Sequence, residues 1–427
     1  MTTFSINTLG CKVNSYESQY YREALIKEGF FPIKNKEVAD IYLINTCTLT
    51  DNATTKSLKM IRRAINKNPL AFIVVVGCVP AVYLDKVKII EGVDLIIGSA
   101  GKTEIASLIK KSYQDKNRKL QELIKTPLEY ENMPIKEFNQ TRAFLKIQDG
   151  CNQKCSYCII PYARGEERSL ALQEVLSIAS DLARNHKEIV LSGIHTGRYG
   201  YSENINLNKL LLEMVKIKDL ERLRLSSIEV NEVSQEIIDL MHKKKKLAHH
   251  LHIPLQSGSV TILKAMNRPY TPKEYLKKLH DIRLILPNIS ISADIIVGFP
   301  GEDEDNWLES LDFIKKCNFS FLHVFPYSAR INTEASLLKN QVSVIKKKQR
   351  VKELLEFSKN QYEKYQDSFI GRNMEVLIEK SKDNYSFGHS SEYLPVTLTK
   401  EYEPNTIVKV RGQSRLSRGI EAIAYED

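Results

Sequence analysis

Residues 144–158 read FLKIQDGCNQKCSYC, in which a short apolar stretch runs into three closely spaced cysteines, Cys151, Cys155 and Cys158. The apolar stretch is typical of a β-strand, and Gly150 allows the backbone to turn directly after it. Three thiolates on one short loop suit a 4Fe–4S cluster in which one iron has no cysteine ligand. A structural zinc site would need a fourth ligand and usually has paired Cys-x-x-Cys spacings, so zinc or a chance grouping of thiols is the weaker alternative.

Strand and helix alternate around this run, from residue 141 to about residue 359, and a long basic helix is expected at 344–366. Five or six strands with intervening helices fit a full or partial β/α barrel of the TIM type. The expected strands are 143–148, 188–192, 222–226, 250–253, 289–297 and 319–325.

Four polar or glycine-containing loops lie at or after these expected strands: LSGIHTG at 191–197, SSIE at 226–229, LQSGS at 255–259 and DIIVGFPGE at 294–302. Ligands bind at the C-terminal ends of the strands in such folds. Each loop alone is a weak indication of a ligand contact. Four of them, in order behind the cysteine run, predict a ligand site at that end of the barrel.

The first hundred residues also alternate between strand and helix, with helices expected at 15–28 and 53–66. Continuous runs of Val and Ile separated by helices are typical of a Rossmann-like parallel sheet that is covered on both faces. The expected strands are 3–9, 40–45, 71–76 and 93–97.

A second set of cysteines, Cys11, Cys47 and Cys78, follows three of these N-terminal strands. The C-terminal ends of parallel strands share one edge of a sheet, so the three thiols should converge despite the thirty or so residues between neighbours. We therefore predict a second three-cysteine cluster with another open iron. Three scattered core cysteines are the alternative. Cys317 belongs to neither set and is expected to be a buried core thiol.

The chain divides into four expected segments. Residues 1–115 form the N-terminal α/β domain, and residues 116–140 are polar and of mixed charge, as in a linker. Residues 141–362 form the larger β/α domain. Residues 363–427 contain short strands separated by turn residues, which predict a small β-barrel.

Composition limits the class of protein. The 427 residues are 42% hydrophobic and 27% charged, as in ordinary globular proteins. No stretch approaches the roughly 20 apolar residues that span a membrane, and the N-terminus lacks the pattern of a secretion signal, so we expect a cytoplasmic protein with no membrane partner. Seven cysteines in such a chain do not suggest a disulfide framework.

The formal charge of +10 would attract a polyanion such as nucleic acid, although a merely basic protein is as good an interpretation. The expected helix at 53–66 gathers cations near Cys47. Its polar face could hold RNA phosphates or could simply be solvated, and the sequence leaves both open. The cations are Lys56, Lys59, Arg62, Arg63 and, just beyond the helix, Lys67.

The cysteine run and the loops behind it resemble the radical S-adenosylmethionine (SAM) enzymes. The motifs around the other cysteines, TLGCKVNSYES at 8–18, NTC at 45–47 and VGC at 76–78, narrow the resemblance to the methylthiotransferases, as do PYARG at 161–165 and MNR at 266–268. The resemblance covers nearly the whole chain, in the family's order of methylthiotransferase domain, radical SAM domain and C-terminal TRAM domain, a known RNA-binding fold.

Within that family, LGCKVN at 9–14 is similar to the tRNA threonylcarbamoyladenosine enzymes. The isopentenyladenosine enzymes typically have Gln-Met-Asn after this cysteine, and the enzymes that modify a ribosomal-protein aspartate have Pro-Lys-Asn. Both remain alternatives, as does a non-catalytic RNA-binding protein with a structural cluster. The segment ARINT at 329–333 departs from the Ser-Pro-Arg-Pro-Gly-Thr that relatives often have there.

The resemblance implies a mechanism. The cluster on Cys151, Cys155 and Cys158 would reduce SAM to a 5′-deoxyadenosyl radical, with electrons from a flavodoxin or ferredoxin. The 4Fe–4S cluster on the other three cysteines would carry the sulfur. The product would be a 2-methylthio adenine beside the anticodon, so the partner would be a tRNA anticodon stem-loop. The resemblance and the strand ends suggest these SAM-binding residues: Tyr157, Ser192, Gly193, Glu229, Gln256, Asp294 and Val297.

Overall fold

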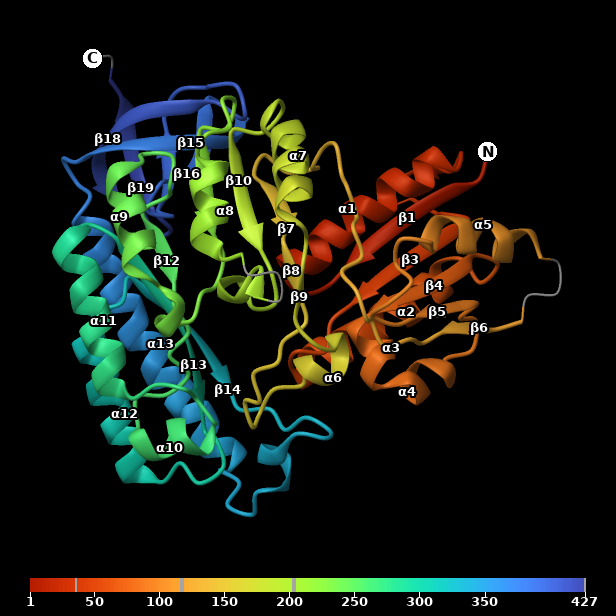
Figure 1. The fold of residues 1–427 in the computed structure, drawn as a ribbon, viewed down its shortest axis with the longest axis horizontal. Coiled ribbons are helices and arrows are strands. Elements are labelled where there is room, and N and C mark those ends of the chain that lie inside the picture. The colour runs from red at the N-terminus through yellow and green to blue at the C-terminus, as the bar shows by residue number, and fades with distance from the viewer. Residues whose placement is uncertain (35–36, 116–118, 202–204, 426–427) are drawn as a thin grey trace.

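The computed structural model describes residues 1–34, 37–115, 119–201 and 205–425. It confirms the expected fold class: an N-terminal parallel sheet, a β/α barrel and a small closed β-barrel. In Figure 1 the red-to-orange N-terminal unit lies on the right, the yellow-to-cyan barrel fills the centre and left, and the blue C-terminal barrel caps the top. Among the described residues, no helix combines the length and the apolar character that crossing a membrane requires.

The N-terminal sheet is wholly parallel, in the order β2-β1-β3-β4-β5-β6. Its central strands are buried along their whole length, as their Val and Ile runs predict. Helices cover both faces (Figure 1). The elements are β1 (Thr3–Thr8), α1 (Lys12–Lys27), β2 (Phe31–Pro32), β3 (Ile41–Thr46), α2 (Asp51–Lys67), β4 (Phe72–Gly77), α3 (Cys78–Val82), α4 (Leu84–Lys88), β5 (Leu95–Ile97), α5 (Ile105–Gln114) and β6 (Gln121–Leu123).

Strand β6 lies within the stretch that we expected to be a linker. It pairs in parallel with β5, so the N-terminal sheet continues into that stretch. The strand was missed because Gln121-Glu122-Leu123 has no apolar pattern: an edge strand is held by backbone hydrogen bonds while its side chains stay half-exposed. The first residues of the expected linker, 116–118, lie outside the described residues.

Six parallel strands form the central barrel, and each lies within or overlaps an expected range. Two three-stranded sheets, β7-β10-β11 and β12-β13-β14, are joined by bridges from Leu223 to Leu247 and from Ser227 to His252. Within the described ranges no pairing links β7 to β14, so the barrel is partial. The strands are β7 (Ala143–Lys146), β10 (Glu188–Ser192), β11 (Arg222–Leu225), β12 (His250–His252), β13 (Ser290–Val297) and β14 (Phe321–Pro326).

Helices pack on the outside of this barrel, and their buried side chains form one core with the strands (Figure 1). Cys317, the last residue of α12, is fully buried in that core, as expected. The helices are α7 (Leu172–Ala183), α8 (Leu207–Met214), α9 (Gln235–Lys243), α10 (Val260–Ala265), α11 (Pro272–Ile285), α12 (Glu304–Cys317) and α13 (Val344–Asp367). The short helix α6 (Ile160–Arg164) contacts α3 of the N-terminal unit instead.

The long helix α13 leads into a closed five-stranded barrel with the order β15-β16-β17-β19-β18. Buried and exposed residues largely alternate along its strands, the period-two pattern of a small barrel. Arg222 and Arg224 of β11 donate hydrogen bonds to its backbone carbonyls, which anchors it to the central barrel. The strands are β15 (Asn373–Lys382), β16 (Tyr385–Ser390), β17 (Pro395–Leu398), β18 (Ile407–Arg415) and β19 (Ile420–Ala424).

Candidate cysteine centres and the cavity between them

The three clustered cysteines lie on the loop between β8 (Gln148–Asp149) and α6, and none is in a disulfide. Gly150 has φ +72°, and a Cβ there would lie 1.8 Å from the Glu166 carbonyl oxygen, so only glycine fits this turn. The Cys151 amide donates to the Gly165 carbonyl at 3.1 Å, which closes the loop. All three thiols are half-buried.

Hydrogen-bond donors surround the sulfur atoms of this loop. The Gln153 amide lies 3.4 Å from Cys151 Sγ, and the Arg268 guanidinium donates to Cys155 Sγ at 3.3 Å. The His195 ring, Nδ1, lies 3.5 Å from Cys151 Sγ, and its Nε2 lies 2.7 Å from Glu232. Donors aimed at sulfur stabilise thiolates, so this set fits an anionic iron–sulfur cluster.

The pKa values at this loop fit a site in which the cysteines are thiolates bound to a metal. Burial raises the pKa of Cys158 to about 12, so the thiol stays protonated unless a metal takes the place of the proton. Burial lowers the pKa of His195, but its hydrogen bonds to Cys151 and Glu232 outweigh this and raise that pKa to about 10. The imidazolium therefore places positive charge beside Cys151.

His195 and Arg268 lie within the motifs at 191–197 and 266–268, but the sequence alone assigned neither of them a role at the cluster. Their positions next to sulfur depend on strands and helices that are distant in sequence, so no local pattern could have assigned them. Arg268 also forms an ion pair with Glu229, which places that predicted SAM-binding residue beside the Cys155 sulfur.

The structure brings only some of the predicted SAM-binding residues together. Tyr157, Gln256 and Asp294 line one cavity with Cys158. Gln256 has φ +67°, and its backbone pairs with β13, which fixes the turn that carries its side chain.

The other four predicted residues, Glu229 among them, line no part of that cavity. The Ser192 hydroxyl is buried and donates to the Leu145 carbonyl at 3.2 Å. Gly193 lies against Gln148, where a Cβ would come within 3.0 Å. The Val297 side chain is fully buried in the core.

The cavity, about 170 Å³ of water-accessible volume, lies where the N-terminal unit meets the barrel. Leu49 and Thr50, just after Cys47, form one wall, and residues 325–328 after β14 form another. Arg330 fixes these walls to each other, because its guanidinium donates to the hydroxyls of Thr48 and Thr54 at 2.7 and 2.8 Å.

The second cysteine set lies at one edge of the N-terminal sheet. Strands β1, β3 and β4 are neighbours in parallel register, and Cys11, Cys47 and Cys78 follow their C-terminal ends. A Cβ on Gly10 would touch the Cys47 Cβ at 3.0 Å, so these two turns are in contact. Burial, and then the charges of Cys78 and Cys11, raise the pKa of Cys47 to about 12. The three thiols thus share one electrostatic environment.

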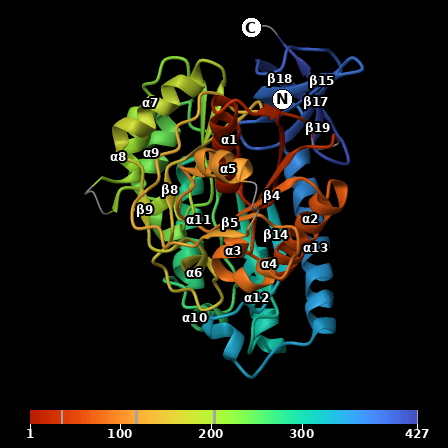
Figure 2. The ribbon, with the colours of Figure 1, turned by 90° about the vertical axis from the view of Figure 1, so that its right-hand side faces the viewer.

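A buried charge network connects the two cysteine loops. Glu17 on α1 accepts from Lys102 at 2.8 Å and from Arg164 at 2.9 Å. Arg164 also contacts Asp149, two residues before Cys151, at 3.1 Å, and Lys146 bridges both carboxylates at 3.3 and 2.6 Å. The five side chains are at most 2% exposed. The network docks the N-terminal unit onto the barrel (Figure 2, where that unit lies in front).

Helix α2 turns its small and apolar residues inward and keeps four cations, Lys56, Lys59, Arg62 and Arg63, on its exposed side. The fifth expected cation differs: Lys67, the last residue of α2, is half-buried and donates to the Glu37 carbonyl. The helix begins beside the second cysteine set, since the Ser57 hydroxyl bonds both the amide and the carbonyl of Cys47.

Two family descriptions match the chain: residues 3–98 match "Uncharacterized protein family UPF0004", and residues 145–314 match "Radical SAM superfamily". Among solved structures, the radical SAM methyltransferase TsrM from Kitasatospora setae superposes with a TM-score of 0.58 at 14% identity, covering 79% of this chain and 77% of that one. The cobalamin-dependent SAM radical enzyme OxsB gives 0.53 at 15% identity, covering 83% of this chain and 56% of that one. These likenesses support the fold.

Sequence relatives cover almost the whole chain. "Threonylcarbamoyladenosine tRNA methylthiotransferase MtaB" from Bacillus subtilis is 37% identical, covering 96% of this chain and 94% of that protein. The protein of the same description from Aquifex aeolicus is 34% identical, covering 88% and 92%. "tRNA-2-methylthio-N(6)-dimethylallyladenosine synthase" from Acetivibrio thermocellus is 33% identical, covering 88% and 80%. With both cysteine sets and the barrel in place, the chain belongs to the radical SAM methylthiotransferase family, close to the MtaB enzymes.

Proposed function

We propose that this enzyme adds a methylthio group to C2 of N6-threonylcarbamoyladenosine, next to the anticodon of tRNA. The observation that carries the proposal is the cavity between the two cysteine loops: Cys158 of one loop and the residues just after Cys47 of the other line the same space. A substrate base bound there would be within reach of both centres. The names of the MtaB relatives support the choice of base.

Cys151, Cys155 and Cys158 would hold the 4Fe–4S cluster that the radical SAM family implies, with SAM on its open iron. When bound, this pair supplies the 5′-deoxyadenosyl radical, which activates a C–H bond that acid–base chemistry does not. Cys11, Cys47 and Cys78 would hold a second 4Fe–4S cluster, which supplies the sulfur. Their shared sheet edge supports this, as does the absence of any disulfide among the described cysteines.

The protein's own residues position and shield these groups. Arg268 and His195 keep positive charge on the sulfur side of the first loop, and Glu229 and Glu232 hold those two side chains in place. Tyr157 lines the cavity, is half-buried and packs against the small apolar cluster that contains Met266 and Tyr327. Asp294 and Gln256, both polar, project to the cavity and are positioned to orient a bound SAM or base.

The partners follow from this assignment. The exposed cations of α2, the helix that begins beside the second cysteine set, would contact the phosphates of the anticodon stem-loop. The terminal barrel, residues 363–427, would serve as a TRAM-type RNA-binding domain. One of its cations, Arg415, is ion-paired with Glu363 and Asp367 of α13, so its charge is already partly neutralised. A flavodoxin or ferredoxin would deliver electrons, and the reaction would take place in the cytoplasm.

The proposal is tested by changing Cys47→Ala and measuring two products. Loss of one cluster should remove roughly half of the iron and abolish 2-methylthio nucleoside formation, while 5′-deoxyadenosine is still formed. Cys317→Ala is the matched control, because that thiol is buried away from both sets. A Cys47→Ala enzyme with full iron content and unchanged product would contradict the second cluster.

The substrate base is tested separately. Nucleoside mass spectrometry of tRNA from a deletion strain should show unmethylthiolated threonylcarbamoyladenosine in place of its 2-methylthio form. Accumulation of isopentenyladenosine instead would favour the alternative that the Acetivibrio relative's name raises.

A further inference from the structure

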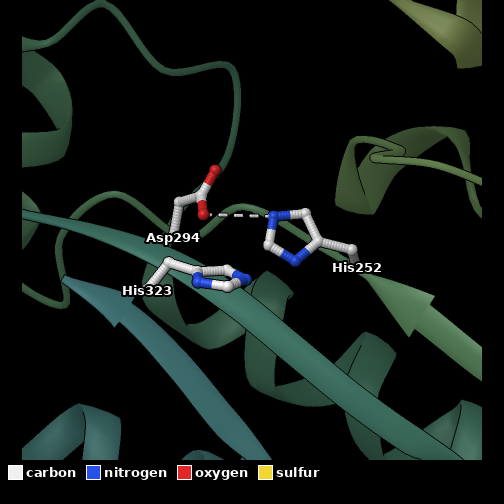
Figure 3. Close-up of side chains that lie close together, drawn as sticks. All are labelled: His252, Asp294 and His323. Carbon is white, nitrogen blue, oxygen red and sulfur yellow. Dashed lines mark ion pairs between the residues drawn. The ribbon is translucent and has the colours of Figure 1, made fainter. Parts of the chain in front are cut away.

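Three polar side chains meet on neighbouring strands of the central barrel. His252 of β12, Asp294 of β13 and His323 of β14 lie close together, and His252 Nε2 is 3.2 Å from Asp294 Oδ1 (Figure 3). Because Asp294 also lines the cavity, this group belongs to the proposed substrate site. A second polar group, centred on Arg164, lies at the boundary between the N-terminal unit and the barrel and lines no part of that cavity.

The buried side-chain amide of Asn14 lies where the three turns of the second cysteine set meet. Its Nδ2 is 3.0 Å from the carbonyl of Leu9, two residues before the first cysteine, and 2.9 Å from the carbonyl of Thr46, directly before the second. It is also 3.1 Å from Asn45 Oδ1. That oxygen packs against the turn before the third cysteine, since a Cβ on Gly77 would lie 2.8 Å from it. One amide group therefore joins all three turns.

Arg164 connects this amide to the other cysteine loop. Its Nη2 donates to Asn14 Oδ1 at 2.9 Å, and its Nη1 donates to both carboxylate oxygens of Asp149 at 3.1 and 3.2 Å. Asp149 Oδ1 in turn accepts the Gly150 amide at 2.9 Å, in the turn that leads into Cys151. Of the side chains that the structure describes, only Arg164 has hydrogen bonds to both Asn14 and Asp149.

Arg164 supplies more than charge. The two buried lysines of the network also bring positive charge to Glu17, but within the described chain neither bonds Asn14. The N–H groups of a guanidinium lie in one plane, so its two ends hold their partners at a fixed offset, whereas a lysine ammonium is a single point on a flexible stem. Glu17 accepts from both ends of Arg164, at 2.9 and 3.3 Å, which fixes the orientation of that plane.

We propose that Arg164 is a positioning residue that sets the offset between the two cysteine loops, so that a radical formed at the first centre is used at the second. The inference rests on the proposed function, in which the first centre supplies the radical and the second supplies the sulfur. If the loops shift relative to each other, SAM is still cleaved. The 5′-deoxyadenosyl radical then takes its hydrogen atom from a C–H group of buffer or protein, and the base is left unmodified.

The test compares Arg164→Lys and Asn14→Ala with the parent, using the reconstituted full-length enzyme and an anticodon stem-loop RNA that carries threonylcarbamoyladenosine. Arg164→Lys keeps the charge but loses the planar fork, and Asn14→Ala leaves every charge of the network in place. In both variants the ratio of 5′-deoxyadenosine to methylthio product should rise by roughly tenfold to a hundredfold, as expected when reacting groups are misplaced by about 1 Å. The rate of 5′-deoxyadenosine formation itself should change little.

Amide hydrogen exchange in the same reconstituted enzyme, without RNA or SAM, tests the link itself. The Leu9 amide donates to the Asn45 carbonyl and the Gly150 amide donates to Asp149, so one protected amide reports on each loop. Exchange in the peptides that contain Leu9 and Gly150 should become faster together in both variants, because the two loops share one connection. In particular, Asn14→Ala should speed exchange at Gly150, which lies in the other unit.

Arg142→Lys is the matched control. Arg142 is a half-buried arginine that also joins two units, since its Nε lies 2.9 Å from Glu379 of the terminal barrel, but it contacts neither cysteine loop. This variant should keep the parent's product ratio and the parent's exchange at both loops. Iron content shows whether both clusters assemble in each variant.

Three results would overturn the inference. One is a product ratio in both variants that equals the parent's. Another is a parallel loss of both products together with iron, which would limit Arg164 to cluster assembly. The third is faster exchange only in the loop that carries the replaced residue. If the parent itself cleaves SAM but forms no methylthio product, the proposed function fails, and coupled exchange at the two loops would still show that Arg164 links them.

Discussion

Replacing Glu17 by Gln should destabilise the protein by several kcal/mol, although the change is nearly isosteric. Glu17 is fully buried and lies 2.8 Å from Lys102, 2.9 Å from Arg164 and 3.3 Å from Lys146. At an effective dielectric constant of 20, each contact has a gross Coulomb energy of about 5–6 kcal/mol. Most of this Coulomb energy is offset by the cost of removing the charges from water. The substitution leaves the cationic partners buried, so their part of that cost stays while the attraction to Glu17 is lost.

Loss of one partner from a buried ion pair typically costs about 3–5 kcal/mol, and we expect Glu17→Gln to fall in that range. Within the described residues Lys102 forms an ion pair with no other acidic side chain, and burial already lowers its pKa. It can therefore release its proton in the variant, which limits the loss. The remaining network still holds Asp149 between Lys146 and Arg164.

The assay is denaturant unfolding of the reconstituted enzyme under anaerobic conditions, together with both product assays. Because Glu17 lies on the helix that begins after Cys11, methylthio product should fall more than 5′-deoxyadenosine. Glu28→Gln, at the C-cap of the same helix, is the control: its ion pair with Lys110 is solvent-exposed, so the change should stay within about 1 kcal/mol. Adding Lys102→Met to Glu17→Gln should recover part of the stability. A Glu17→Gln protein as stable as the control would refute this account of the docking.

Three further predictions concern the cluster, the RNA surface and acid stability. Cys155→Ala should abolish 5′-deoxyadenosine formation, because it removes one of three cluster ligands; substantial cleavage of SAM by that variant would disprove the ligand assignment. Changing Arg62→Glu and Arg63→Glu together should weaken tRNA binding. It should also reduce the slope of log affinity against log salt concentration by about one unit for each lost phosphate contact, while SAM cleavage without RNA stays unchanged. A variant that binds tRNA as tightly as the parent enzyme at every salt concentration would show that α2 is a solvated surface helix. Burial raises the pKa of Glu188, but the charges of Arg224 and Arg222 outweigh burial and lower this pKa to about 2, below the unfolded value of about 4.3. The ionised Glu188 therefore contributes about 3 kcal/mol to the free energy of unfolding above about pH 5, and this contribution is lost as pH falls toward 2. The stability difference between the parent and Glu188→Gln should shrink over that range, and a constant difference would contradict the pairing.

Local patterns in the sequence were sufficient for the fold class and for both cysteine sets. The strands around residues 41–46 and 72–77 are apolar throughout, so burial on both faces and hence a parallel sheet could be inferred before any contact was known. The same rule placed Cys47 and Cys78 at one edge, because the ends of parallel strands coincide. Strand β6 was not predicted, because an edge strand needs no apolar pattern.

Only the tertiary structure decided what surrounds the cysteines. Arg268 lies beside Cys155, more than a hundred residues earlier, and Glu17 meets Arg164 across two domains. Such contacts depend on how whole units dock, and a charged residue at a future interface looks in sequence like any exposed one. The cavity and the group of His252, Asp294 and His323 arise in the same way: periodicity says which face of a strand is buried, but the side chains that meet there are set by strand register and by packing between units.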